Sequence, residues 1–280
     1  MRSLMTFLAA AGLVGGLVLP ALSDPAPKAT PTLAERAIAL DDLDAVARLT
    51  ALSFIEQPLD ALAETMPPLA EAWAATAPKH FSAELIYSDY VAIVAALDAS
   101  VLTSVIAFGE SDLGRRLHAA EMAMIDPEEA VDLLQIGTKA VARLETVNPR
   151  RLEQVHAIMD AIQMVETNAV ALSRFNEAMT AGMLIALDRP VPVDDEELAR
   201  MCACLEEQLR PALASAFESM MTAAYIGFTE AELVRYLDHL RSPQGQAYIG
   251  GIAGGSTSAL VRRAEAVDQD LARKLTKEDL

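Results

Sequence analysis

Proline recurs at intervals along a chain that otherwise consists mostly of helix-favouring residues. Alanine is the commonest residue and leucine is next, while only 5% of the residues are aromatic. Because alanine and leucine favour helix, and because no alternating strand pattern with hairpin turns is present, the chain is predicted to be all-α. Proline is poorly tolerated beyond the first turn of a helix, so the prolines predict many separate helices. The predicted fold is a multi-helix bundle of short helical hairpins around one or two long helices.

Two of these prolines directly follow a capping residue, which is typical of a helix start. The pairs are Asp126-Pro127 and Asn148-Pro149, each with proline at the first helical position. The helix that begins at Pro149 is predicted to be the longest. Its apolar positions from Val155 to Leu172 alternate at spacings of three and four, as in the contact face of a bundle helix.

Other breaks are expected inside the apolar stretches. Pro58 and Pro78 are predicted to divide their surroundings into short helices, and Pro190 with Pro192 forms the clearest break. Two pseudo-repeated halves are expected to meet near Pro190. The paired glycines within residues 250–255 predict a flexible joint between two helices.

The charge of the chain excludes several classes of protein. There are 40 acidic residues against 22 basic ones, and the formal net charge is -18. Such a chain repels phosphate, which argues against a nucleic-acid partner. With 52% hydrophobic residues and two cysteines, it resembles neither a disordered acidic tail nor a disulfide scaffold.

The N-terminal residues have the pattern of a secretory signal peptide. Arg2 precedes an apolar run from Leu4 to Leu19, and Ala21-Leu22-Ser23 supplies small residues at the positions that a signal peptidase reads. Residues 1–23 are therefore predicted to be removed on export, and residues 24–31 to form a proline-rich linker. An uncleaved anchor is the alternative. After cleavage no membrane span is expected, which predicts a soluble periplasmic or secreted protein.

A short pattern occurs twice, with an offset of 131 residues. Residues 102–114 can be aligned with residues 233–245, so that Ser111 falls on Ser242 and Gly114 on Gly245. In each copy a serine can cap the second helix of a hairpin, and a glycine one turn later allows the two helices to approach closely. Each copy therefore predicts a tight helical hairpin.

The second copy lies in a stretch that resembles a known family. Phe228 and Thr229 with Glu232 and Leu233, followed by Ser242-Pro243-Gln-Gly245, resemble the bacterial "domain of unknown function 2059" family. The resemblance covers about residues 194–260, and the copy around residues 100–120 is a weaker version. It implies an exported helical domain, a capping box at Thr229 and Glu232, and a hairpin corner at Ser242, Pro243 and Gly245. It implies no catalytic residue and no cofactor.

The resemblance also sets the predicted domain organisation. Residues 32–189 form an N-terminal helical region with a degenerate hairpin at Ser111 and Gly114. Residues 190–280 form the C-terminal helical domain that resembles the family.

Three residues near the second corner have the types found in a hydrolase triad. Asp238 and His239 are adjacent and would point about 100° apart on a helix, so the acid is badly placed to orient the imidazole. Ser242 is explained by capping alone. Catalysis by this set is therefore not predicted.

Other candidate groups have plainer interpretations. His118 with Glu121, and His156 with Asp160, are spaced to share a helix face, which suits either a metal-ligand pair or an ordinary surface pair. The surface pair is the favoured interpretation, and no metal or other cofactor is predicted.

Cys202 and Cys204 leave three alternatives open. On a helix they point roughly opposite ways, so a bond between them would be strained. They are small apolar helix residues, or form an intermolecular disulfide, or belong to a soft-metal site with methionine.

Three functions are compatible with the sequence. The favoured hypothesis is a non-enzymatic interaction or scaffold protein of the bacterial periplasm with an unknown protein partner. The second is a hydrolase-type enzyme, which would need His239 or His118 to meet an acid and a nucleophile in a pocket. The third is a metal or redox role for Cys202 and Cys204.

Overall fold

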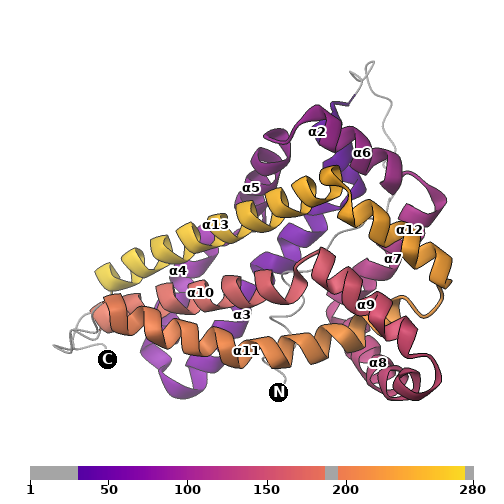
Figure 1. Ribbon diagram of the computed structural model, residues 1–280. Helices are drawn as coiled ribbons and strands as arrows, with labels where there is room; N and C mark the ends of the chain where they lie inside the picture. The colour runs from indigo at the N-terminus through magenta and orange to yellow at the C-terminus, as the bar shows by residue number, and fades with distance from the viewer. Residues whose placement is uncertain (1–30, 187–194, 275–280) are drawn as a thin grey trace.

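The all-α prediction is confirmed by the computed structural model, which describes residues 31–186 and 195–274. Every regular element in these two ranges is an α-helix, and they contain no strand (Figure 1). The helices of the first half are α2 (Leu33–Leu40), α3 (Leu43–Thr65), α4 (Pro67–His80), α5 (Ala83–Ala95), α6 (Ala99–Gly109), α7 (Asp112–Ile125) and α8 (Pro127–Val147). The remaining helices are α9 (Pro149–Ala161), α10 (Met164–Ala186), α11 (Asp195–Ala224), α12 (Glu230–Arg241) and α13 (Pro243–Lys274).

Pro58 and Pro78 do not divide the chain as predicted. Pro58 lies inside α3 and Pro78 lies inside α4. Proline removes one backbone hydrogen bond and bends a helix, but burial of the flanking apolar side chains can hold the helix together. Phe54 and Leu62, on either side of Pro58, are both buried in the same core.

The helix that begins at Pro149 is shorter than predicted. It ends at Ala161, and Gln163 takes a left-handed backbone conformation with φ of 53° before α10 begins. The apolar positions that suggested one helix still share a single core, from Val155 on α9 to Leu172 on α10. The pattern therefore predicted the buried face correctly and missed the bend within it.

The expected joint at residues 250–255 is absent, because α13 continues through it for 32 residues. Two of the four glycines within residues 250–255 allow close packing against another segment of the chain instead. A Cβ at Gly251 would lie 2.7 Å from the Leu97 side chain, and one at Gly255 would lie 2.6 Å from Ile93. These glycines let α13 approach α5 and the turn that follows it, which explains why glycine occurs inside a helix.

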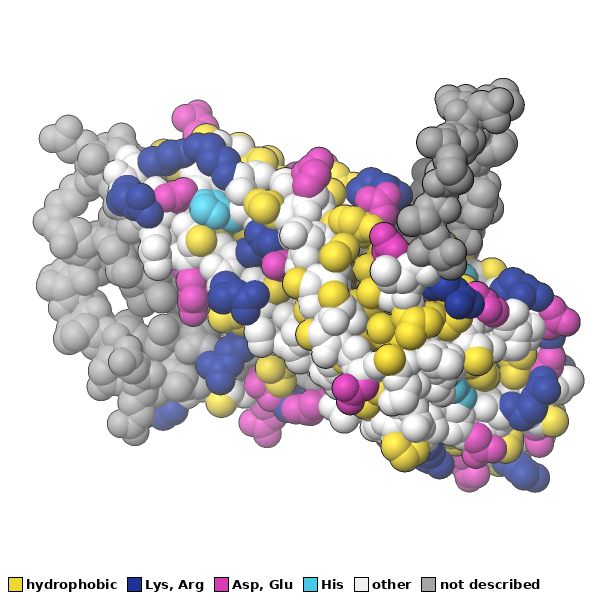
Figure 2. All heavy atoms as spheres, turned by 90° about the horizontal axis from the view of Figure 1, so that it is seen from above, with side chains coloured by type: hydrophobic (Ala, Val, Ile, Leu, Met, Phe, Trp, Pro, Cys, Tyr) yellow, Lys and Arg dark blue, Asp and Glu magenta, His cyan; other side chains and the backbone are white. Residues whose placement is uncertain are grey.

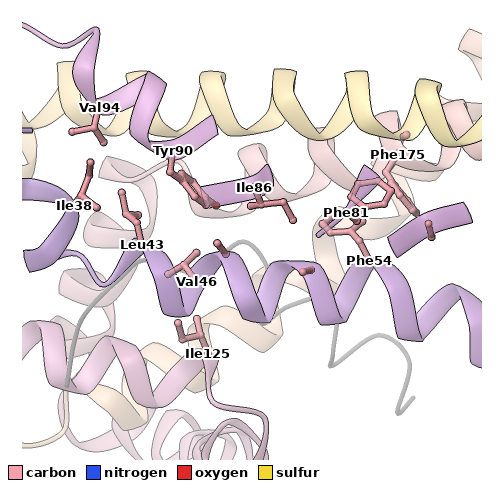
Figure 3. Packing of buried hydrophobic residues seen from close by; sticks show 14 of the residues in the cluster. Ile38, Leu43, Val46, Phe54, Phe81, Ile86, Tyr90, Val94, Ile125 and Phe175 are labelled. Carbon is pink, nitrogen blue, oxygen red and sulfur yellow. The ribbon is translucent and has the colours of Figure 1, made fainter. Parts of the chain in front are cut away.

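One hydrophobic core is built by α2 to α6 together with α13. Figure 3 shows its side chains pointing inward from several of these helices. Phe175 of α10 joins it, with its ring centroid 4.7 Å from that of Phe54 and 5.9 Å from that of Phe81. Trp73 is fully buried beside them and donates a hydrogen bond of 2.9 Å to the Ile55 carbonyl oxygen.

A second core is built by α7 to α12. Phe217, Met221 and Tyr225, at or beside the C-terminal end of α11, are almost fully buried there. Arg151 of α9 is also buried and donates hydrogen bonds to the carbonyl oxygens of Tyr225 and, at 2.7 Å, Phe228. This side chain therefore joins α9 to the turn between α11 and α12.

The long helices connect the two cores. In Figure 1, α10 lies between α13 and α11. The first core contains residues from both ends of the described chain, such as Ile38 and Leu271. The predicted boundary at Pro190, the signal peptide and the linker of residues 24–31, apart from its last residue, lie outside the described residues. The division into two regions stays a prediction.

Within the described ranges, no single helix is long and apolar enough to cross a membrane. A pair of segments bent by 111°, Pro67–Ala95 and Ala99–Gly109, meets the criteria of length and composition together.

Candidate functional site

The two serine-glycine corners have matching hydrogen bonds. Between α6 and α7, the Ser111 hydroxyl donates to the Phe108 carbonyl oxygen at 2.6 Å and accepts from the Gly114 N–H at 3.0 Å. Between α12 and α13, the Ser242 hydroxyl donates to the His239 carbonyl oxygen at 2.7 Å and accepts from the Gly245 N–H at 3.0 Å. Each serine hydroxyl is therefore used within its own corner.

The glycines of the two corners have no room for a side chain. A Cβ at Gly114 would lie 2.1 Å from the Phe108 carbonyl oxygen, and one at Gly245 would lie 2.3 Å from the His239 carbonyl oxygen. Both contacts are with backbone atoms, which cannot move aside as a flexible side chain can. Glycine is required at each corner so that the helices can approach this closely.

The two corners are in direct contact. Phe108 and His239, which occupy equivalent positions in the sequence alignment of the two copies, stack with ring centroids 4.0 Å apart and an interplanar angle of 4°. Tyr236 stacks near Phe108 as well, at 5.8 Å. The internal repeat itself stays a prediction, but its two copies lie side by side.

A second contact, between α7 and α12, involves the capping box that starts α12. The Thr229 N–H donates to Glu232 at 2.8 Å, and the Glu232 N–H donates to the Thr229 hydroxyl at 3.2 Å. Arg116 of α7 also donates to the Glu232 carboxylate. These hydrogen bonds lower the pKa of Glu232 to about 2, so the carboxylate stays ionised. The next residue, Leu233, is buried in the second core.

A cavity of about 120 Å³ lies where the two corners meet the end of α2. Helices α6, α7, α12 and α13 provide its other walls. The lining includes the side chains of Asp41, Val105, Phe108, Arg115, His118, Glu121, Tyr236, His239 and Tyr248. The remaining walls are largely apolar. The volume is near that of a cavity known to hold benzene, about 150 Å³, so it is large enough for a small molecule.

Glu121 is a buried acid at the wall of this cavity. Its side chain is on α7, and the residue is only 5% exposed. Its Oε1 accepts hydrogen bonds from the Tyr225 hydroxyl at 2.6 Å and the Tyr236 hydroxyl at 2.7 Å. Burial raises the pKa of Glu121 because an ionised carboxylate loses its water, and the two tyrosine hydroxyls partly oppose this rise.

Asp41 is the second acid, at the C-terminal cap of α2. Its Oδ2 accepts a hydrogen bond from the Tyr248 hydroxyl of α13. Desolvation raises the pKa of Asp41 to about 8, and the charge of nearby Glu121 adds to this rise. The two carboxyl groups therefore repel one another when both are ionised.

The raised pKa of Asp41 predicts that folding stability changes with pH. Between about pH 4 and pH 8 the folded protein holds a proton that the unfolded chain releases, so the free energy of unfolding falls as pH rises. The steepest slope expected from one such group is about 1.4 kcal/mol per pH unit. The other titratable side chains at the cavity are Glu121, Arg115, His118, His239, Tyr236 and Tyr248.

Urea unfolding of the wild-type protein and of Asp41→Asn, measured from pH 4 to pH 9, isolates this effect. The stability of the wild-type protein relative to the variant is expected to fall over this range. Parallel pH profiles for the two proteins would contradict the assignment.

The triad residues named from the sequence do not assemble for catalysis. The His239 ring lies flat on Phe108, and burial lowers its pKa, which favours the neutral imidazole. The Ser242 hydroxyl is used in capping, and Asp238 is exposed. His239 nevertheless lies at the cavity together with His118, which was not expected from their separation in sequence.

The surface-pair interpretation of His118 and Glu121 is wrong for Glu121, which is buried. The helical spacing placed both residues on the side of α7 that faces the cavity, and Tyr225, just after α11, and Tyr236 of α12 cover the acid. The other pair also takes a different partner. His156 lies 2.7 Å from Glu218 of α11, rather than bonding Asp160 on its own helix.

Of the two cysteines, only Cys204 has a described side chain. Cys204 is an exposed free thiol on α11, and the Gln208 side chain donates to its Sγ at 3.3 Å. The side chain of Cys202 lies outside the described residues. Within the described part of the chain, no group of three or more histidine, cysteine, aspartate or glutamate side chains is placed to hold a metal ion.

Sequence reasoning missed the hydrogen-bonded centre of the site, although one signal was present. Leu113, Leu117 and Glu121 follow one another at spacings of four on α7, so the acid occupies a position where the pattern requires an apolar residue. A charge at such a position indicates a buried polar contact. Asp41 gave no such signal, because acids near a helix start are common.

Comparison with known proteins provides no relative. The chain matches no family model, no curated protein and no solved structure. The resemblance of residues 194–260 to the "domain of unknown function 2059" family stays a prediction.

Proposed function

We propose that this protein is an exported helical binding protein that holds a small molecule in the cavity beside Glu121. The observation that supports the proposal is the cavity itself, where four helices and the end of α2 bring apolar walls and two carboxyl groups together. Binding sites for small molecules typically combine an apolar lining with a few placed polar groups. Export is proposed from the sequence pattern of residues 1–23 alone.

Binding is preferred over catalysis because the candidate nucleophile is already in use. The Ser242 hydroxyl makes two hydrogen bonds within its corner, and the His239 ring is packed against Phe108. A hydrolase-type reaction needs a serine and an imidazole that face each other and the substrate.

The interaction or scaffold role inferred from the sequence remains a second proposal. Hydrophobic side chains gather between charged ones on the face seen in Figure 2. The most exposed large hydrophobic residues of the described part are Val147, at the end of α8, and Ile226, in the turn after α11, where a protein partner could reach them. A pull-down of the tagged protein from periplasmic extract tests this role, and recovery of no specific partner would count against it.

Filling the cavity tests the binding proposal. Val105 lines the cavity and is almost fully buried, so Val105→Phe is expected to occupy the space. Val234→Phe on α12 is the matched control, because Val234 is exposed and is not part of the lining. Phenol, n-butanol and n-butylammonium are suitable probes for a cavity of this volume.

The measurement is the change in amide NMR signals of Gly109, Gly114 and Gly245 on titration with each probe. At least one probe is expected to cause saturable shifts in the wild-type and control proteins but not in Val105→Phe. The binding proposal fails if no probe shifts these signals in the wild-type protein.

A further inference from the structure

Two acids line the cavity without a neutralising partner. Asp41 and Glu121 come from different helices, and within the described residues neither carboxyl group forms an ion pair. Glu121 is almost completely removed from water. Burying two like charges close together is unfavourable unless they bind protons or a cation.

Each carboxyl group has one oxygen occupied and one available. Tyr225 and Tyr236 both donate to Oε1 of Glu121, and Tyr248 donates to Oδ2 of Asp41. Among the described residues, no hydrogen bond reaches Oε2 of Glu121 or Oδ1 of Asp41. The tyrosines therefore fix the orientation of the two groups and leave two acceptor atoms for a donor inside the cavity.

Three basic side chains line the cavity, Arg115, His118 and His239, and two of them are directed away from the acids. Arg115 donates to the Glu110 carbonyl oxygen and to the Asp112 carboxylate on the outer side of its helix, and most of its side chain is exposed. His239 is stacked on Phe108, and burial lowers its pKa, which favours the neutral imidazole. Within the described residues no ion pair joins Arg115, His118 or His239 to either acid, so a ligand can supply the positive charge that faces them.

We infer that the ligand carries a small organic ammonium group, which donates to Glu121 and Asp41 while its alkyl part contacts the apolar wall. This inference rests on the proposed binding function and specifies the chemistry of its ligand. An ammonium group supplies three donors, so it can satisfy both available oxygens at once. The tyrosine rings at the cavity wall also favour a cation.

A metal ion fits this site less well. Hard divalent cations prefer six or more oxygen ligands, and the described residues include no third acidic or histidine side chain placed to share a metal ion with these two acids. An anionic ligand would be repelled by both carboxyl groups. The cavity volume restricts the ligand, or the part of it that enters, to a few heavy atoms.

Isothermal titration of the full chain at pH 8.5 with n-butylammonium and with n-butanol separates charge from shape. The wild-type protein is expected to bind the cation more tightly than the alcohol. Asp41→Asn and Glu121→Gln are expected to weaken binding of the cation about 10- to 100-fold, the loss typical of a charged hydrogen bond. Both variants keep the shape of the replaced side chain and should bind the alcohol as before.

Glu110→Gln is the control, because Glu110 lies at the same corner but pairs with Arg36 on the surface. It should leave the affinity for n-butylammonium unchanged. The inference fails if n-butanol binds as tightly as the cation, or if the cation binds equally well to Asp41→Asn and Glu121→Gln. If n-butanol binds as tightly as the cation, a small-molecule site remains and only the ligand chemistry is wrong. If neither probe binds to the wild-type protein, the proposed binding function is wrong as well. If Mg²⁺ or Ca²⁺ binds more tightly than n-butylammonium, the ligand of the site is a metal ion and the inference of an organic cation is wrong.

Discussion

Gly245→Ala is expected to lower the free energy of unfolding by about 3 kcal/mol, because its new Cβ meets backbone rather than a movable side chain. The added atom would lie 2.3 Å from the His239 carbonyl oxygen and 2.8 Å from that of Leu240. Relief requires α12 and α13 to separate at their corner. That movement would also break the bond between the Gly245 N–H and Ser242 and disturb the cavity wall.

The same substitution elsewhere on α13 should have the opposite effect. Gly254 is helical, and no atom lies within 4 Å of a Cβ built there. Gly254→Ala is therefore expected to stabilise the protein by about 0.5–1 kcal/mol, through the helix propensity of alanine. Urea unfolding of both variants at one pH provides the measurement. If Gly245→Ala is as stable as the wild-type protein, α12 and α13 do not approach each other as closely at Gly245 as the structure indicates.

Arg151→Met is the second substitution with a large expected effect. It removes the hydrogen bonds to the carbonyl oxygens of Tyr225 and Phe228. Among the described residues this leaves the Phe228 oxygen without a donor, and the Tyr225 oxygen keeps only the Phe228 N–H, at 3.0 Å. Loss of a partner from a buried polar group costs about 1–3 kcal/mol, and more when the removed partner is charged. A loss of about 3 kcal/mol is expected, since methionine preserves the apolar packing of the stem.

The neighbouring arginine provides the control for this experiment. The Arg150 side chain is 73% exposed and reaches Glu230 only at 4.0 Å. Arg150→Met should change the stability by no more than about 0.5 kcal/mol. Thermal and urea unfolding of the two variants should agree in rank. Equal stabilities for the Arg150 and Arg151 variants would show that the buried hydrogen bonds contribute little.

Much of the helical structure could be predicted because its causes are local. The capping box of Thr229 with Glu232, and the proline starts at Pro149 and Pro243, depend on neighbours within one helical turn. The hairpin corners are of the same kind, since a serine bonds backbone three residues away. Such short-range contacts leave a clear sequence pattern.

Features that depend on distant parts of the chain could not be predicted in this way. Pro58 stays within a helix because Phe54 and Leu62 are held in a core made by other helices. Gly251 and Gly255 allow α5 to pack closely, which the sequence alone cannot distinguish from a flexible joint. The site belongs to this class, since Glu121 acquires its role only when Tyr225 and Tyr236 approach from positions more than 100 residues further along the chain.

The position of α13 also determines when the protein can fold. The hydrogen bond between Tyr248 and Asp41 joins residues 207 apart in sequence, and the contacts of Asp270 with His80 and of Lys274 with Thr76 span 190 and 198. The first core thus lacks one wall until α13 has been synthesised. Contacts between distant residues slow folding, since long loops must close before any energy is gained. Until α13 has been made, the apolar faces of α2 to α6 stay partly uncovered, which favours aggregation of the growing chain.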